Sequence, residues 1–309
     1  MNNEKNRVAQ VPSANRCEIG MHAMESRPDS SRPGSGERVA RPAQRFLART
    51  TTSLIALACS VAHAQNADEL AKQLSNPVAS LTSVPLQLND DEGFGPPGSG
   101  DRVLLNVQPV VPTSISESWN LISRTILPIV WQNDVAPGTG SQSGLGDITQ
   151  SLFFSPKAPG ASGWIWGVGP ALLIPTATDD LLGTEKWGAG PTAVMLKQTP
   201  TGWTYGALVN HLWSFAGSSH RADVSSTFLQ PFVSKGLGSG RTVTLNFEST
   251  YDWEMSQATI PSNLSYSKVT RIRGQLASYV VGARYYFDAP DGGPEWGVRF
   301  AFTLLFPKK

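Results

Sequence analysis

The sequence predicts an all-β fold, a transmembrane antiparallel β-barrel of about twelve strands preceded by a short N-terminal segment. Three observations predict it: apolar and polar residues alternate with a period of two over long stretches, these stretches are about twice as long as ordinary soluble strands, and long and short connections alternate along the chain. Glycine and proline, the two poorest helix formers, occupy 29 and 23 of the 309 positions, which argues against a helical protein.

The first 64 residues have the composition of a leader. Residues 53–64 form a short apolar stretch that follows several arginines and ends in the pattern Ala62-His63-Ala64. This combination predicts a secretory signal peptide that is cleaved after Ala64. A lipoprotein signal through Cys59 is an alternative, although Ala56 stands where such signals usually carry a bulky aliphatic residue.

The charge balance changes after the leader. Residues 1–64 contain nine Arg and Lys against five Asp and Glu, whereas residues 65–309 contain sixteen against nineteen. The mature part therefore lacks the excess of cations that would attract nucleic acid. Both cysteines, Cys17 and Cys59, lie in the leader, so the mature part contains no disulfide, zinc-thiolate site or cysteine nucleophile. The sequence also has no apolar run near the ~18 residues of a spanning helix.

The mature chain begins with a segment over residues 65–79, and the barrel is predicted over 80–309. The N-terminal segment predicts a short helix, periplasmic or inside the barrel, because Leu70 and Leu74 share one helical face. The barrel then shows strict alternation, clearest in its last strand, where Phe300, Phe302 and Phe306 share one face. The predicted strands are 80–88, 103–112, 118–131, 145–156, 163–175, 187–199, 202–215, 223–235, 241–253, 259–271, 275–287 and 295–306.

The lengths of strands and connections fit a membrane barrel. Twelve residues at ~3.3 Å each, tilted by ~45°, span about 28 Å, which is close to the thickness of a hydrocarbon core. The odd-numbered connections average about nine residues and the even-numbered ones about four, as in barrels with long external loops and short periplasmic turns. All nine tryptophans lie in the mature part, mostly near predicted strand ends, which predicts two aromatic girdles. Core tryptophans of a soluble β protein are the alternative.

Six prolines oppose this prediction, because a closed barrel has no free edge to accommodate them. Some of them are expected at bulges or beyond the true strand ends. They are Pro109, Pro128, Pro170, Pro191, Pro231 and Pro261.

Several stretches resemble bacterial outer-membrane proteins of the phenol meta-pathway ("MetA") family, whose members are often labelled transporter or neuromedin U. The resemblance covers nearly all of residues 69–307. It implies a porin-like barrel that passes small solutes, aromatic or hydrophobic ones among them, and it carries over no functional residues. The stretches are Glu69–Leu81, Trp119–Pro128, Ser141–Asp147, Ser151–Lys157 and Phe228–Phe232.

The candidate functional residues are polar residues inside strands. A charge that faces lipid at mid-depth costs about 2–4 kcal/mol, so these side chains are expected in the lumen. Opposed acidic and basic arcs would create a transverse field at a constriction. The alternative is that the charges pair and satisfy each other in a plugged barrel. The candidates are Asn106, Arg124, Glu248, Asp252, Arg284, Tyr286 and Arg299.

Signals for catalysis or ligand binding elsewhere are weak. His211 and His220 are the histidines that follow the leader, and no spacing demands a serine partner for a membrane-embedded lipid hydrolase. Gly138–Gly144 is glycine-rich but lacks the lysine and the following helix of a phosphate-binding loop. Asp90–Glu92 and Asp179–Asp180 are predicted to be solvated loop residues, with calcium or divalent ions that bridge lipopolysaccharide as alternatives. No metal, cofactor or enzymatic activity is therefore predicted.

These observations predict a passive outer-membrane channel for small solutes in a Gram-negative bacterium. The expected partners are outer-membrane lipids, lipopolysaccharide and the barrel-assembly machinery, and no nucleic acid. A closed structural or binding barrel, with residues 65–79 in its lumen, is the second hypothesis, and the lipid hydrolase is the third.

Overall fold

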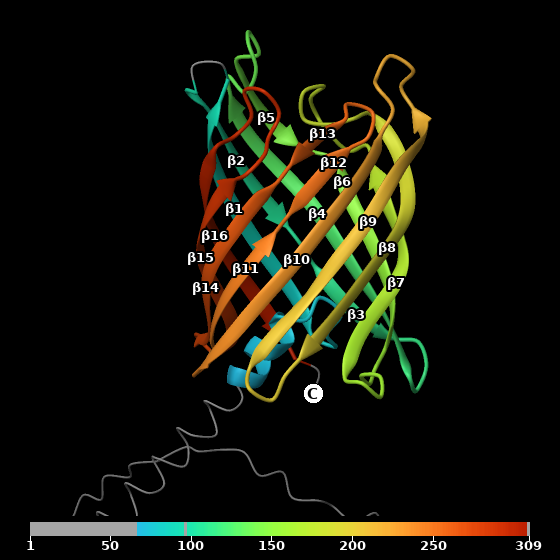
Figure 1. Cartoon of the computed structure of the whole chain (residues 1–309), viewed down its shortest axis with the longest axis vertical. Helices are drawn as coiled ribbons and strands as arrows, with labels where there is room; N and C mark the ends of the chain where they lie inside the picture. Colours follow the sequence, from blue (N-terminus) through green and yellow to red (C-terminus); the bar gives the residue numbers. More distant parts are fainter. Residues whose placement is uncertain (1–66, 96–97, 308–309) are drawn as a thin grey trace, which may run out of the picture. The chain divides into compact units, whose positions relative to one another are not determined.

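The structure is a computed structural model, and it describes residues 67–95 and 98–307. These residues form one antiparallel sheet that closes into a barrel (Figure 1). The leader and its cleavage site lie outside the described residues. The strand segments are β1 (Thr82–Phe94), β2 (Gly100–Val107), β3 (Val110–Ser114), β4 (Trp119–Asn133), β5 (Ser141–Leu145), β6 (Ile148–Pro156), β7 (Trp164–Ile174), β8 (Lys186–Gln198), β9 (Trp203–Gly217), β10 (Ser225–Gly238), β11 (Arg241–Phe247), β12 (Ser249–Asp252), β13 (Gln257–Thr259), β14 (Pro261–Ile272), β15 (Gln275–Tyr286) and β16 (Trp296–Phe306).

The sixteen segments make up twelve barrel strands, because four strands are divided into two segments each. The divided strands are β2–β3, β5–β6, β11–β12 and β13–β14. The ring closes through β1 with β16 on one side and through β10 with β11 and β12 on the other. The predicted fold class, an all-β antiparallel barrel of about twelve strands, is confirmed.

The two faces of each strand differ as the alternation predicts. On β16, Phe300 and Phe306 point outward and are 51% and 44% exposed, whereas Arg299 and Leu305 point inward and are 5% and 1% exposed. In a bilayer the outward side chains meet hydrocarbon, so their exposure is favourable there. The barrel therefore carries an apolar outer belt and encloses polar groups.

The tryptophans form two groups at the two ends of the barrel. Trp119, Trp164, Trp166 and Trp203 lie near the end with the short turns, which we call the short-turn end. The other five lie at the opposite, long-loop end, and all five are more than 40% exposed: Trp131, Trp187, Trp213, Trp253 and Trp296. This placement confirms the predicted girdles, because amphipathic rings favour the level of the lipid headgroups.

Each of the six in-strand prolines lies beside a local gap in the hydrogen-bond ladder. Pro231 pairs with Ala207 of β9 on one side, while the pairing of β10 with β11 and β12 is interrupted on the other. The register is the same on both sides of this gap, so the gap reflects the missing N–H of proline and not an inserted residue. Only the gap beside Pro128 coincides with a one-residue shift, a β-bulge between β5 and β6. The expectation that some prolines lie at bulges or beyond strand ends is met by Pro128, which is beside the bulge, and by Pro109, which lies between the end of β2 at Val107 and the start of β3 at Val110.

The first strand is longer than predicted, and this changes the interpretation of an acidic motif. β1 continues to Phe94, six residues past the predicted end at residue 88. Asp90–Glu92 therefore belongs to a strand, and its prediction as a solvated loop is wrong. Asp91 is only 4% exposed and faces the lumen. Part of Gly138–Gly144 also forms a strand, since β5 begins at Ser141.

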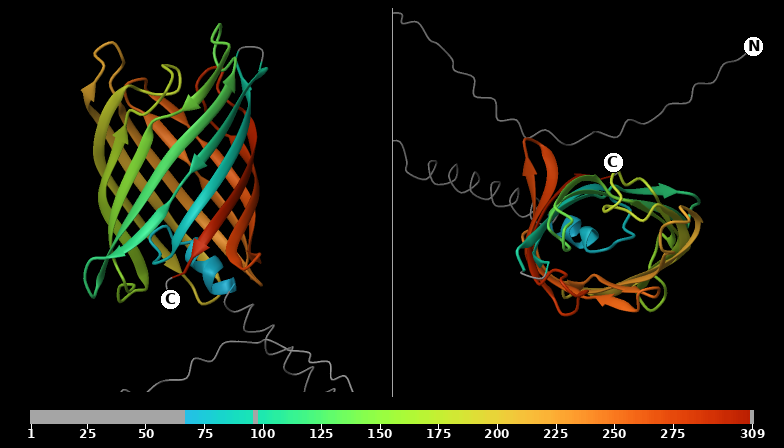
Figure 2. Two further views of the ribbon diagram at one scale, coloured as in Figure 1. Left: turned by 180° about the vertical axis from the view of Figure 1, so that it is seen from behind. Right: turned by 90° about the horizontal axis from the view of Figure 1, so that it is seen from above.

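The N-terminal segment lies inside the barrel at the short-turn end (Figure 2). It forms a helix over residues 67–74, in agreement with the predicted short helix. Leu70 and Leu81 pack against Val269 of β14 and Leu305 of β16. Val78 is buried in a second cluster with five inward side chains from four strands, β4, β6, β8 and β9: Ile122, Phe153, Val194, Leu196 and Leu208. The segment is therefore held by apolar contacts to opposite parts of the wall.

Polar contacts tie the same segment to the turns at this end. Asp68 accepts a hydrogen bond from the backbone N–H of Gly240 at 2.6 Å, and Gln198 donates to the carbonyl of Lys72 at 2.7 Å.

Within the described residues, no helix has the length and apolarity needed to cross a membrane.

The outward face predicts one effect of mutation. Leu264 lies near the middle of β14, is 57% exposed and pairs with Leu245 and Ala283. Leu264→Arg should destabilise the folded barrel in phospholipid vesicles by about 2–4 kcal/mol, because the guanidinium would meet hydrocarbon. Tryptophan fluorescence during urea unfolding measures the loss. Ser219→Arg, in an exposed loop, is the control, and equal stabilities of the two variants would contradict a lipid-facing β14.

Candidate functional site

Glu248 is placed in the lumen by the gap between β11 and β12. The gap lies opposite the step from Gln230 to Pro231 in β10. The N–H of Glu248 still donates to the carbonyl of Pro261 at 3.1 Å, so the residue keeps its position in the sheet. Leu245 and Tyr251 on the same strand point outward. Alternation therefore directs the Glu248 side chain inward.

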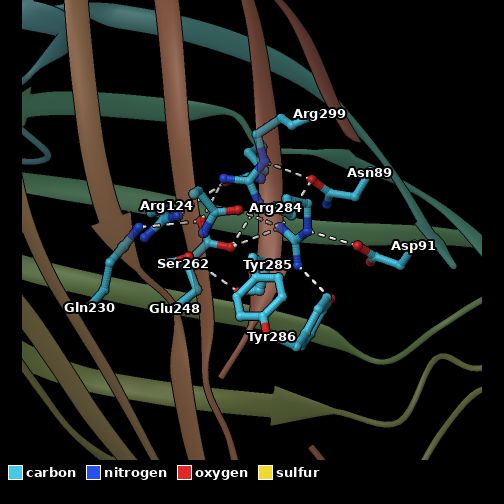
Figure 3. A network of polar contacts seen from close by, with 12 residues as sticks. Asn89, Asp91, Arg124, Gln230, Glu248, Ser262, Arg284, Tyr285, Tyr286 and Arg299 are labelled. Carbon is cyan, nitrogen blue, oxygen red and sulfur yellow. Dashed lines mark hydrogen bonds and ion pairs between the residues drawn. The ribbon is translucent and has the colours of Figure 1, made fainter. Parts of the chain in front are cut away.

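The carboxylate of Glu248 is bound by two arginines (Figure 3). Arg299 donates to it through Nη1 at 2.8 Å and through Nη2 at 2.7 Å, and Arg284 donates through Nη1 at 3.3 Å. The side chains of Arg284 and Arg299 are 7% and 6% exposed. A bidentate, charge-assisted contact at low exposure is among the strongest polar contacts a protein makes.

Arg284 extends this network to β1 and β14. Its Nε donates to Asp91 at 2.8 Å, its Nη1 donates to Asn263 at 3.0 Å, and its Nη2 donates to the Tyr286 hydroxyl at 2.8 Å. Asn89 accepts from both Arg284 and Arg299, at 3.3 and 2.7 Å. We call the whole set the arginine layer: Asn89, Asp91, Arg124, Glu248, Asn263, Arg284, Tyr286 and Arg299.

Five of the seven residues predicted from the sequence lie in this layer: Arg124, Glu248, Arg284, Tyr286 and Arg299. Arg124 donates from Nη2 to Gln108 at 3.0 Å and lies beside Glu248 (Figure 3). Glu248, Arg284 and Arg299 are paired and do not form opposed arcs, whereas Arg124 has a neutral partner. For the three paired residues the structure corresponds to the alternative in which the charges satisfy each other.

The other two predicted residues lie outside the layer. Asn106 is on β2 opposite Gln87, on the inward face. Asp252 also lies on the inward face of its strand, but its Oδ1 accepts hydrogen bonds from the backbone N–H groups of Glu254 and Met255 at 2.9 and 3.0 Å. Asp252 thus stabilises the turn after β12.

Sequence reasoning missed Asn89, Asp91 and Asn263. Asn89 and Asp91 lie beyond residue 88, where the sequence predicts the end of this strand, whereas β1 continues to Phe94. A signal was present, since Leu86 and Leu88 continue the apolar alternation up to Asn89. Asn263 is an uncharged residue in a polar stretch of β14, so its sequence neighbours give no comparable sign.

Three adjoining cavities lie on the short-turn side of the arginine layer. The mouth cavity, of about 420 Å³, lies between the helix and the turns of β8–β9 and β10–β11. The central chamber, of about 280 Å³, has Thr244, Asn246 and Ser265 in its wall and reaches Arg299. The arginine pocket, of about 190 Å³, reaches Arg124 and Gln108. Neighbouring cavities share lining residues, so the three lie next to one another.

One buried polar atom marks the central chamber. The Oδ1 atom of Asn246 has no hydrogen-bond partner among the described residues, although it is buried. Buried polar atoms in proteins are nearly always satisfied. The Oδ1 atom of Asn246 is thus an exception among the described residues of the chamber wall.

The histidines and the loop acids form no second site. Nδ1 of His211 lies 2.7 Å from Oγ1 of Thr227, and its ring lies 3.9 Å from that of Trp213 on the outer face. His220 is in an exposed loop. Asp179 accepts a hydrogen bond from the N–H of Leu181 in its own loop. Within the described part of the chain, no group of three His, Cys, Asp or Glu residues is placed to hold a metal ion.

Comparison with known proteins shows the fold. No protein-family model and no curated protein sequence matches the chain. Its structure is similar to that of the COG4313 outer membrane channel from Pseudomonas putida F1, with a TM-score of 0.58 and 13% identity, over 74% of this chain and 96% of that one.

Two other solved structures match with lower scores. The β domain of the Bordetella autotransporter BrkA has a TM-score of 0.40 at 12% identity, over 73% of this chain and 99% of that one. A bacterial polysaccharide outer membrane secretin has a TM-score of 0.31 at 11% identity, over 74% and 99%. At these identities the fold alone is shown, and the first match carries it: the chain has the fold of an outer-membrane β-barrel.

The arginine layer predicts the effect of removing its central anion. Glu248→Gln should destabilise the barrel by about 3 kcal/mol, because Arg284 and Arg299 would each lose a carboxylate while remaining buried. Urea unfolding in vesicles or micelles measures the change. Asp252→Asn, an inward acid outside the layer, is the matched control, and an equally large loss in the control would contradict the special position of Glu248.

Proposed function

We propose that the chain forms a channel in the outer membrane for the passive passage of small solutes. The proposal includes export through the signal peptide with cleavage after Ala64, insertion by the barrel-assembly machinery, and contact with outer-membrane lipids and lipopolysaccharide. The apolar outer belt and the two tryptophan girdles support the location. A channel function is also what the name of the Pseudomonas putida neighbour states for that protein.

The series of adjoining cavities is the observation that carries the proposal. The mouth cavity and the central chamber share Ala71, Ser75, Ser234 and Thr242. The proposed route follows these adjoining cavities from the short-turn end, alongside the helix, to the arginine layer. Its wall in the central chamber is rich in hydroxyl and amide groups, which suit water and small polar solutes.

Two barriers on this route restrict the size of the solute. The N-terminal segment occupies part of the mouth, and the arginine layer crosses the lumen farther in. Both favour small molecules. The resemblance to the phenol meta-pathway family supports small aromatic or hydrophobic solutes as candidates, and a liposome-swelling assay with phenol, sugars and amino acids would rank them.

A closed structural or binding barrel is the second candidate. The apolar contacts of Leu70 and Val78 and the paired charges of Glu248 favour it, because both reduce the open lumen.

A membrane-embedded lipid hydrolase is the third and weakest candidate. His211 contacts a threonine and a tryptophan on the outer face, and the proposal therefore includes no catalytic step.

Deletion of residues 67–79 tests whether the N-terminal segment restricts the channel. In planar bilayers the wild-type barrel should show discrete conductance steps, and the deletion should raise the step size several-fold because it clears the mouth. Deletion of residues 136–139, in a loop at the other end, is the control. Silent bilayers with both wild type and deletion, with folding verified by heat-modifiable gel mobility, would overturn the channel and favour the closed barrel.

Neutralisation of the lumen acids tests the electrostatics of the same route. Glu248→Gln combined with Asp252→Asn should shift the reversal potential in a salt gradient toward anion preference, since Arg124, Arg284 and Arg299 would keep their charge. Asp180→Asn, in an exposed loop, should leave the potential unchanged. A double variant with wild-type selectivity would place the conducting path away from the arginine layer.

A further inference from the structure

Arg124 differs from its neighbours in the arginine layer because it has no carboxylate partner. The two carboxylates of the layer, Asp91 and Glu248, are bound by Arg284 and Arg299. Arg124 donates to the neutral side chain of Gln108, and no carboxylate oxygen of the described residues lies within 4.0 Å of its guanidinium. A guanidinium held away from bulk water is costly unless it is paired. The site is therefore suited to an anion that is not part of the chain.

The surrounding charges also favour an anion. Glu248 lies beside Arg124, but its carboxylate is already neutralised by its two arginines. Arg102 lies farther toward the long-loop end, where it donates to Gln132 at 3.1 Å and its guanidinium lies 4.7 Å from the ring centre of Phe94. The arginine layer itself holds three guanidinium groups, those of Arg124, Arg284 and Arg299, against the two carboxylates of Asp91 and Glu248.

The pocket at Arg124 has both polar and apolar groups in its wall. Arg124, Gln108 and Gln230 supply polar groups from the strands, and Gln73, Asn76 and Ser83 add further polar groups. The apolar part of the wall consists of Leu74, Pro77, Ala79, Leu81, Pro85 and Val110. The cavity measures about 190 Å³, below the roughly 300–1,000 Å³ of sites for drug-sized ligands. Its occupant must therefore be small, with a charged end and an apolar body.

We propose that this pocket binds a small monocarboxylate. The carboxylate would lie on the guanidinium of Arg124, whose planar fork matches the two oxygens, and Gln230 lines the same pocket. The apolar body would lie against Leu74, Pro77 and Leu81. The inference rests on the proposed function, because it treats the arginine pocket as a binding site for a solute that passes through the barrel.

Isothermal titration of the detergent-extracted, folded barrel tests the site without relying on conduction. Sodium butyrate should bind saturably with one site per barrel, and butyramide, which has the same shape without the charge, should bind at least tenfold more weakly. Arg124→Gln should weaken butyrate binding at least tenfold, while Arg124→Lys, which keeps the charge but loses the fork, should retain measurable binding. Arg271→Gln, at an exposed turn, is the control and should bind like the wild type.

Each outcome separates this site from the channel. Equal binding of butyrate and butyramide by the wild type would overturn the proposal, even if Arg124→Gln failed to fold. Butyrate binding that survives Arg124→Gln would also overturn it. A barrel that conducts ions but binds no butyrate would refute the site and leave the channel in place. A barrel that binds butyrate through Arg124 but is silent in bilayers would support the site and refute the channel.

Discussion

The structure depends on one constraint: a backbone inside a hydrocarbon layer must satisfy its hydrogen bonds within the protein. A sheet meets this constraint only when it closes, because closure removes the edges at which N–H and carbonyl groups would be unpaired. Once the sheet is closed, the pleat divides every strand into an outward and an inward set of side chains. The apolar belt, the girdles and the polar lumen all follow from that division, as Phe300 and Arg299, adjacent on β16, illustrate.

The prolines show how the barrel accommodates exceptions to this constraint. A proline removes one donor, and each in-strand proline lies where the ladder on one side is already interrupted. The gap at Pro231 lies beside Glu248, the acid at the centre of the arginine layer. Glu248 keeps its hydrogen bond to the carbonyl of Pro261 across the gap, and its side chain contacts Arg284 and Arg299. The proline that opposes the barrel prediction in the sequence thus lies next to the best-organised polar contacts in the lumen.

The sequence predicts much of this architecture because period-two alternation is a local property. The number of strands, their inward and outward faces, and five residues of the arginine layer follow from alternation alone. The end of β1 was missed because Asn89–Glu92 and the following glycines have the composition of a turn, while the contacts of Asp91 with Arg284 join residues 193 positions apart. The sequence does not decide whether residues 67–81 lie inside the barrel, and the reason is again sequence distance. Leu70 and Leu74 predict a helix, but the residues they pack against, Val269 and Leu305, are near the other end of the chain.

The arrangement of charges decides how the lumen can select among solutes. In the arginine layer the acids are bound by Arg284 and Arg299, so they contribute rigidity more than local field. Arg124 is left with a neutral partner and adjoins a pocket whose walls belong to the N-terminal segment. The same segment that narrows the mouth therefore also shapes the apolar side of the pocket. A change in its position would alter the size of the route and the fit of the pocket together, so conduction and selectivity are coupled through one short stretch of chain.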